Sequence, residues 1–120
     1  MTKKVVFISL PMSRLSDEKI EEQLKKAKRA YLDQTQTDIR EIAFDDNFNR
    51  VVFEPADFEV IQEGREPLFY LSGALGRMAC CDEVFLYGNW EEARGCRVEN
   101  YVCELYGVPH VYWNGTESET

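Results

Sequence analysis

A buried strand that leads through a polar loop into a helix is the feature that most constrains this chain. Residues 83–87 (EVFLY) form a mainly apolar run without alternation, which is typical of a strand covered on both faces. A helix is predicted over residues 96–106, because Gly107 can form a left-handed cap and Pro109 cannot continue a helix. The loop between them therefore opens at the carboxyl end of a parallel strand, where open α/β sheets usually bind ligands.

The amino-terminal part of the chain predicts a second strand and helix of the same kind. Residues 3–9 (KKVVFIS) are β-branched and apolar like a central parallel strand, and Pro11 ends the run. Ser16 is a plausible helix N-cap, and a helix is predicted to continue to about Asp33. Its apolar positions recur at helical spacing, at Ile20, Leu24, Ala27 and Tyr31.

The middle of the chain is less regular. Residues 39–44 suit either a short extra strand or a helix extension, and we favour the strand. Residues 50–53 (RVVF) are expected to be the return strand of the first βαβ unit, and residues 56–65 an acidic loop. Pro67 is expected to start a helix. The apolar stripe predicted for that helix consists of Leu68, Leu71, Leu75 and Met78.

These elements predict one α/β domain over residues 1–120. Residues 109–113 (PHVYW) are expected to be the closing strand, and residues 114–120 a flexible tail. Strands that alternate with helices predict a mainly parallel sheet of four or five strands, with helices on both faces. The expected architecture therefore has three layers.

Charge and hydropathy exclude several classes of function. The net charge of −8 repels a polyanionic backbone, so we expect no nucleic acid polymer as a partner. The apolar runs are far shorter than the roughly 20 residues of a membrane-spanning helix. Ser9 and Pro11 interrupt the apolar amino terminus, and no cleavage site of small residues follows. We therefore expect a cytoplasmic protein with no membrane partner.

Four cysteines leave a disulfide, a metal site or reduced thiols as alternatives. The adjacent pair Cys80 and Cys81 lacks the two-residue spacing of a zinc knuckle, and His110 is the only histidine. Together with Cys96 and Cys103, they are expected to be buried, reduced thiols. We therefore expect no metal and no other cofactor.

The candidate ligand-binding residues lie in the loops after the predicted strands. Glu99, one turn into its helix, is either a first-turn glutamate that favours the helix dipole or a carboxylate that faces a ligand. Arg94 and Arg97 are either exposed surface residues or an anion site beside Gly95. Trp90 is either a hydrophobic plug or a platform for stacking a base.

Three stretches of the sequence resemble the nucleoside 2-deoxyribosyltransferase-like superfamily, and more closely its short phage and bacterial branch of unassigned function. The stretches are VVFISLPMS near the start, CCDEVFLYGNW, and ARGCRVENYV. Gly95 precedes Glu99 by four residues, and Asp82 stands before a buried strand, as in that superfamily. The resemblance covers most of the chain in order and implies a flavodoxin-like, Rossmann-like sheet and a homo-oligomer.

The resemblance also implies glycosidic chemistry on a small nucleoside or nucleotide. Glu99 would attack the anomeric carbon and form a covalent glycosyl–enzyme intermediate, which water or another base then resolves. Asp82 is either a surface carboxylate at the start of its strand or, as the resemblance implies, the group that protonates or orients the leaving base. The residues expected to bind the substrate are Ser9, Pro11, Ser13, Asn89, Trp90, Arg94, Gly95 and Arg97.

Three departures from the superfamily pattern favour a second hypothesis. Val6 stands where related enzymes carry a tyrosine that holds the nucleophile, and Leu10 replaces the glycine of the first loop. Ala93 replaces a serine that binds a 5′-phosphate in nucleotide-hydrolysing relatives. The alternative is therefore a non-catalytic protein that binds a nucleotide-derived ligand in the same crevice.

Overall fold

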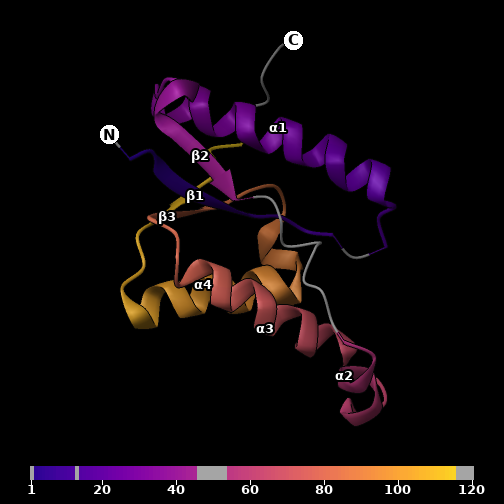
Figure 1. Cartoon of the computed structure of the whole chain (residues 1–120). Coiled ribbons are helices and arrows are strands. Elements are labelled where there is room, and N and C mark those ends of the chain that lie inside the picture. Colours follow the sequence, from indigo (N-terminus) through magenta and orange to yellow (C-terminus); the bar gives the residue numbers. More distant parts are fainter. Residues whose placement is uncertain (1, 13, 46–53, 116–120) are drawn as a thin grey trace.

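Four parallel strands in the order β2-β1-β3-β4 form the centre of the computed structural model, which describes residues 2–12, 14–45 and 54–115. The strands are β1 (Lys4–Ser9), β2 (Ile42–Asp45), β3 (Glu83–Leu86) and β4 (His110–Tyr112). The helix α1 (Asp17–Thr35) covers one face of this sheet, and α3 (Glu66–Met78) and α4 (Arg94–Tyr106) cover the other (Figure 1). The predicted three-layer α/β architecture is therefore confirmed.

The order of the strands places a switch point between β1 and β3. From this central pair the chain moves outward in opposite directions, through α1 to β2 and through α4 to β4. Right-handed crossovers in opposite directions put α1 and α4 on opposite faces of the sheet. The loops that leave the carboxyl ends of β1 and β3 therefore diverge, and this is where open α/β sheets bind their ligands.

The central strands are buried on both faces, as their sequences predict. Ser9 is aligned with Leu86 across β1 and β3, and the Tyr87 amide extends the pairing by donating to the Ser9 carbonyl at 2.9 Å. The residues of these two strands that are at most 1% exposed are Val6, Phe7, Ile8, Val84, Phe85 and Leu86. Such continuous burial explains why neither strand alternates between apolar and polar residues.

Several predicted boundaries are confirmed by local chemistry. Ser16 caps α1 by accepting a hydrogen bond from the Lys19 amide, at 3.2 Å. Gly107 ends α4 with a φ of 69°, in the left-handed region that favours glycine. The helix α4 begins at Arg94, two residues before its predicted start, and the short 3-10 helix η3 (Trp90–Glu92) precedes it.

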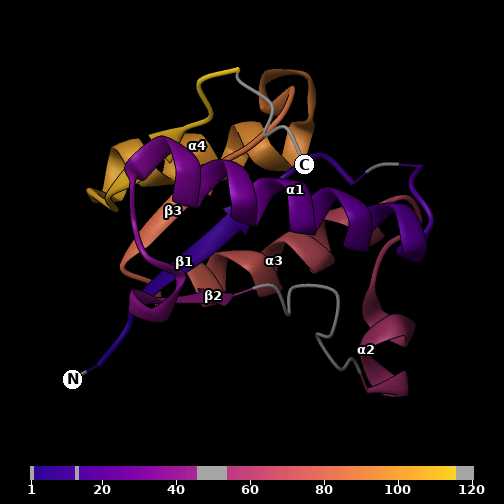
Figure 2. The same ribbon diagram turned by 90° about the horizontal axis from the view of Figure 1, so that it is seen from above.

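The middle of the chain corrects the sequence analysis. The strand predicted over 39–44 is confirmed for its second half, as β2, but the 3-10 helix η1 (Ile39–Glu41) occupies its first half, and β2 is the return strand that pairs with β1. That role was predicted for residues 50–53, which lie outside the described residues. Much of the predicted acidic loop is helical, because α2 (Pro55–Val60) occupies it, away from the strands (Figures 1 and 2).

The predicted apolar stripe of α3 is only partly correct. Met78 is 2% exposed and Leu75 packs against the core, but Leu68 is 63% exposed. The buried side of the helix instead includes Ala74. The first turn of α3 therefore extends past the edge of the sheet that its later turns cover.

Candidate functional site

A buried carboxyl group meets a buried hydroxyl group at the switch point of the sheet. The Ser9 hydroxyl, at the carboxyl end of β1, donates a hydrogen bond of 2.6 Å to Glu99 Oε1 on α4. Ser9 is 2% exposed and Glu99 is 7% exposed, and they are the buried polar residues of the described chain. Of the two alternatives for Glu99, this placement excludes an exposed first-turn glutamate and leaves a carboxyl group at the ligand-binding edge.

The helical repeat of α4 explains why Glu99 points inward. Cys96, Glu99 and Cys103 are three and four residues apart, so they share one face of the helix, and all three are buried. Side chains on a helix lean toward its amino terminus, so the Glu99 carboxyl group lies over the preceding turn. Gly95 lies in that turn without a side chain, and a Cβ atom there would meet nothing within 4 Å. The space at Gly95, one turn before Glu99 on the helix, is therefore open.

Burial changes the acidity of this site. Desolvation raises the pKa of Glu99 from 4.5 to about 7, although the hydrogen bond from Ser9 acts in the opposite direction. Desolvation also raises the pKa of the neighbouring Cys96 to about 12, so this thiol stays protonated at neutral pH. A carboxyl group that titrates near pH 7 can serve as a nucleophile, base or acid, and such groups are typical of functional sites.

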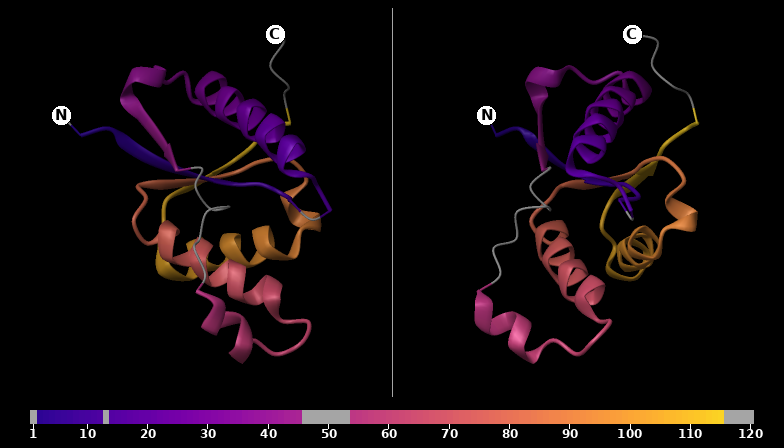
Figure 3. Two further views of the ribbon diagram at one scale, coloured as in Figure 1. Left: turned by 45° about the vertical axis from the view of Figure 1, so that its right-hand side comes forward. Right: turned by 90° about the vertical axis from the view of Figure 1, so that its right-hand side faces the viewer.

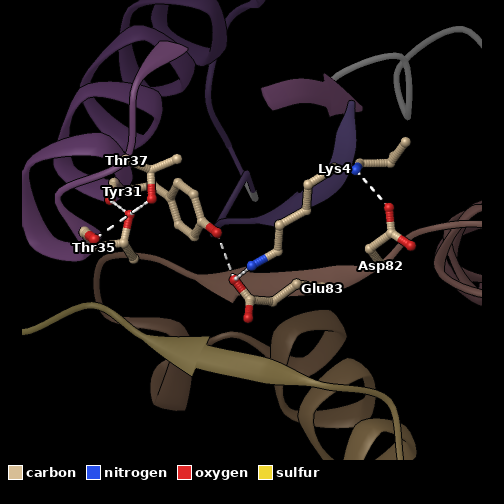
Figure 4. Close-up of polar contacts among 7 residues, drawn as sticks. Lys4, Tyr31, Thr35, Thr37, Asp82 and Glu83 are labelled. Atoms are coloured by element: carbon tan, nitrogen blue, oxygen red, sulfur yellow. Dashed lines mark hydrogen bonds and ion pairs between the residues drawn. The ribbon is translucent and has the colours of Figure 1, made fainter. Parts of the chain in front are cut away.

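Asp82 does not share this site, which corrects the predicted pairing with Glu99. The Asp82 carboxylate accepts a hydrogen bond of 2.7 Å from the Val5 amide, and the Asp82 amide donates to the Val5 carbonyl. Figure 4 shows the carboxylate turned toward the backbone at the start of β1. Val5 precedes Ser9 by a strand rise of about 13 Å. Within one chain, Asp82 therefore lies at the opposite end of the strands and cannot protonate a base held at Glu99.

A second group of polar side chains lies at that opposite end (Figure 4). Tyr31 donates a hydrogen bond of 2.6 Å to Glu83 Oε1, and Lys4 Nζ lies 3.2 Å from the same oxygen. Burial is the largest cause of a raised Tyr31 pKa, so this hydroxyl keeps its proton. The group joins α1 to β1 and β3, and we interpret it as structural.

A family model provides the one similarity found to known proteins. The model, described as "Domain of unknown function (DUF4406)", matches residues 4–112, most of the chain. The chain belongs to this family. No match was found among curated proteins or among solved structures. The DUF4406 match includes both Ser9 and Glu99, as well as every strand of the described sheet.

The other residues predicted to bind a substrate in this DUF4406 chain are partly buried, exposed or outside the described residues. Pro11 is partly buried beside the β3–α4 loop, where its Cδ atom would lie 3.7 Å from a Cβ atom at Gly88. Ser13 lies outside the described residues. The residues around the start of α4 are exposed, and these are Asn89, Arg94, Gly95 and Arg97.

Trp90 packs within the protein. Its ring stacks on Tyr112 of β4 with the ring centroids 5.3 Å apart and the planes 22° from parallel. It is partly buried against the core. Of the two alternatives, this contact favours the hydrophobic plug, since one face of the indole already has an aromatic partner.

The sequence analysis missed the partner of Glu99. Val6, at the position of the superfamily tyrosine, is fully buried in the core and has no polar group to offer. The hydroxyl that contacts Glu99 belongs instead to Ser9, at the end of the same strand. The detectable signal was a single polar residue closing an apolar strand, but the sequence did not show which polar group it would meet.

The cysteines and the candidate metal ligands give a mixed result. All four cysteines are free, and Cys96 and Cys103 are buried, but Cys80 is exposed and Cys81 is only partly buried. Burial of all four was therefore a wrong prediction. In the described ranges, no three residues of the metal-binding types gather where they could hold an ion. No helix in these ranges is both long and apolar enough to cross a membrane.

Proposed function

We propose that this protein cleaves or transfers the N-glycosidic bond of a nucleoside or nucleotide, with Glu99 as the nucleophile. One observation carries the proposal: Glu99 is buried at the carboxyl ends of β1 and β3, held by a hydroxyl group. This is the position at which open α/β sheets bind small ligands. The resemblance to nucleoside 2-deoxyribosyltransferases supports the proposal independently, because it assigns the nucleophile to the same residue.

The proposed reaction needs one carboxylate in its first step. A Glu99 oxygen forms a bond to the anomeric carbon of the sugar while the bond from that carbon to the base nitrogen breaks. The base leaves with the electron pair and takes a proton from water. Water, or a second base, then attacks the anomeric carbon and displaces Glu99, so the stereochemistry at this carbon is retained.

The environment of Glu99 suits a transition state with positive charge. An oxocarbenium-like sugar beside the ionised carboxylate would be stabilised strongly, because Glu99 is buried and the charges interact in a low dielectric. The hydrogen bond from Ser9 holds one oxygen, Oε1, and leaves Oε2 for the sugar. In this proposal Arg94, exposed in the first turn of α4, attracts an anionic substituent such as a 5′-phosphate.

The cellular location forms part of the proposal. All four cysteines are free thiols, and free thiols persist in reducing compartments. We therefore propose that the protein acts in the cytoplasm, where nucleosides and nucleotides are also metabolised.

The second candidate function is binding without turnover. The position of Asp82 favours it, because the carboxylate expected to protonate the leaving base lies at the other end of β3. In this alternative the ligand is still a nucleoside or nucleotide, and Glu99 binds a sugar hydroxyl group.

The test is incubation with a panel of ribonucleosides, deoxyribonucleosides and their 5′-monophosphates. Chromatography measures free base, and thermal unfolding measures binding. The glycosidase proposal predicts free base from at least one compound and its loss in Glu99→Gln, with exposed Glu63→Gln as the matched control. Thermal stabilisation without free base would support the binding alternative. Undiminished base release by Glu99→Gln would exclude Glu99 as the nucleophile.

A further inference from the structure

The outward face of α4 carries an apolar stripe. Val98, Tyr101 and Leu105 are 40%, 60% and 61% exposed, respectively. They are three and four residues apart, so they form one line along the helix. This line is opposite the buried line of Cys96, Glu99 and Cys103.

This arrangement is unusual for a helix that covers a sheet. Such a helix normally buries one apolar face and turns charged or polar side chains to solvent. No described helix or strand covers the side of α4 that faces away from the sheet (Figure 3). A line of three large exposed apolar side chains on one helix is typical of an interaction surface.

Two charged residues flank the stripe and indicate what it binds. Arg97 and Glu104 are both exposed and lie seven residues apart, so they are on the same side of the stripe. If two copies of α4 pack antiparallel with Tyr101 at the centre, Arg97 faces Glu104 of the partner subunit. The two-fold symmetry of such a pair repeats this contact. A parallel two-fold pairing would instead put the charged flanks of the two helices on opposite sides of the interface, so that Arg97 and Glu104 would not meet.

We propose that α4 is a self-association surface through which two copies of this chain form an antiparallel, two-fold symmetric dimer. The apolar stripe supplies the buried area, and the Arg97–Glu104 pairs set the direction and register. The antiparallel arrangement also places the positive end of each helix dipole beside the negative end of the other. This inference goes beyond the proposed function and does not depend on it, because it uses the face of α4 opposite Glu99.

The first test is the association state of the full chain by analytical ultracentrifugation. We expect a dimer, and Leu105→Glu is expected to raise the dissociation constant by roughly a hundredfold or more, because it puts a charge into an apolar interface. Leu68→Glu, at an exposed leucine on α3, is the matched control and should leave the dimer intact. A monomer at high protein concentration would overturn the proposal, as would a dimer that Leu105→Glu does not weaken.

The second test exchanges the flanking charges. Its result rests on recovery of the dimer, so a small loss of folding stability in a single variant does not affect it. Arg97→Glu places two glutamates against each other, and Glu104→Arg places two arginines together, so each variant alone should dissociate about tenfold or more readily. Mixing these two variants restores opposite charges at both contacts, and the mixture should form heterodimers. The double variant with both changes should dimerise like the wild type. If neither the mixture nor the double variant recovers, the antiparallel register is wrong.

Discussion

The Ser9 hydroxyl and the Glu99 carboxyl group are 90 residues apart in the chain, yet they form a buried hydrogen bond of 2.6 Å. Ser9 ends β1, and Glu99 is on the helix that follows β3. The bond therefore connects the two central strands at the edge where their loops diverge. A buried carboxyl group is costly to ionise, so Glu99 beside a single hydroxyl group is a candidate functional residue.

Removing the Ser9 hydroxyl should destabilise the protein and raise the pKa of Glu99 further. Ser9→Ala leaves Oε1 without its donor in a buried environment, which costs about 1–3 kcal/mol of unfolding free energy. Chemical denaturation at fixed pH measures this loss. Ser72→Ala removes an exposed hydroxyl on α3 and should change stability by no more than about 0.5 kcal/mol. If the two substitutions changed the free energy of unfolding equally, the Ser9–Glu99 hydrogen bond would stabilise the protein no more than an exposed hydroxyl group does.

The pKa of Glu99 predicts how stability depends on pH. Its ordinary value is 4.5, and burial raises it to about 7 in the folded protein. Between these values the folded state keeps a proton that the unfolded state has lost. The contribution of Glu99 is therefore greatest below pH 4.5, falls as the pH rises and is lost above about pH 7. The total loss is roughly 3 kcal/mol.

Glu99→Gln isolates this pH dependence from that of the other acidic residues. The variant cannot ionise at this position but keeps an oxygen that can accept from Ser9. Wild-type stability minus variant stability should therefore decline across this pH range and then level off. A difference that stays constant from pH 4 to pH 8 would mean that Glu99 titrates normally.

Asp82 should prove structural. Asp82→Ala removes the acceptor for the Val5 amide and should cost about 1 kcal/mol, while Asp82→Asn keeps an acceptor oxygen and should cost less. Neither change should slow base release, because Asp82 is at the far end of the strands. Denaturation and a rate assay on the same preparations separate the two effects. If either Asp82 variant lowered the rate of base release as much as Glu99→Gln does, Asp82 would take part in the reaction.

Substitutions at Gly95 should separate the access of the substrate to Glu99 from the stability of α4. Gly95→Ala is expected to stabilise α4 by about 0.5–1 kcal/mol, because alanine favours the helix and its Cβ atom meets nothing nearby. Gly95→Leu should fold but lower base release by at least about tenfold, by filling the open space one turn before Glu99. Gly76→Leu, at a helical glycine of α3 with equally open space, is the control. Unchanged turnover in Gly95→Leu would show that the substrate approaches from elsewhere.

Most of the fold could be predicted from the sequence, because the residue patterns that predict each strand and helix end agree with which residues the structure buries. The runs that became β1 and β3 are apolar throughout, and Ser16 and Gly107 mark helix ends by their own chemistry. The segment 39–44 was ambiguous, because a 3-10 turn and a strand share it. The helix α2 was missed because acidic residues obscured its short pattern.

The candidate site could be predicted only in part, because it depends on distances across the sheet. The position of Glu99 after a buried strand made it a candidate for the ligand-binding edge, and the resemblance to the deoxyribosyltransferase-like superfamily selected it. The same reasoning could not determine which residues would face it. Ser9 was expected to bind substrate but contacts Glu99, and Asp82 was expected beside Glu99 but bonds to Val5. Only the register of β1 against β3 distinguishes these outcomes.

The most direct test of the central claim is the mass of the protein during a single turnover. Wild-type protein in excess over a cleavable nucleoside or nucleotide is quenched with acid at intervals, digested and analysed by mass spectrometry. If Glu99 is the nucleophile, we expect a transient sugar adduct on the peptide that contains Glu99, which disappears as the sugar is released. Release of the base within that turnover, with no sugar on Glu99 at any time, would show that Glu99 is not the nucleophile.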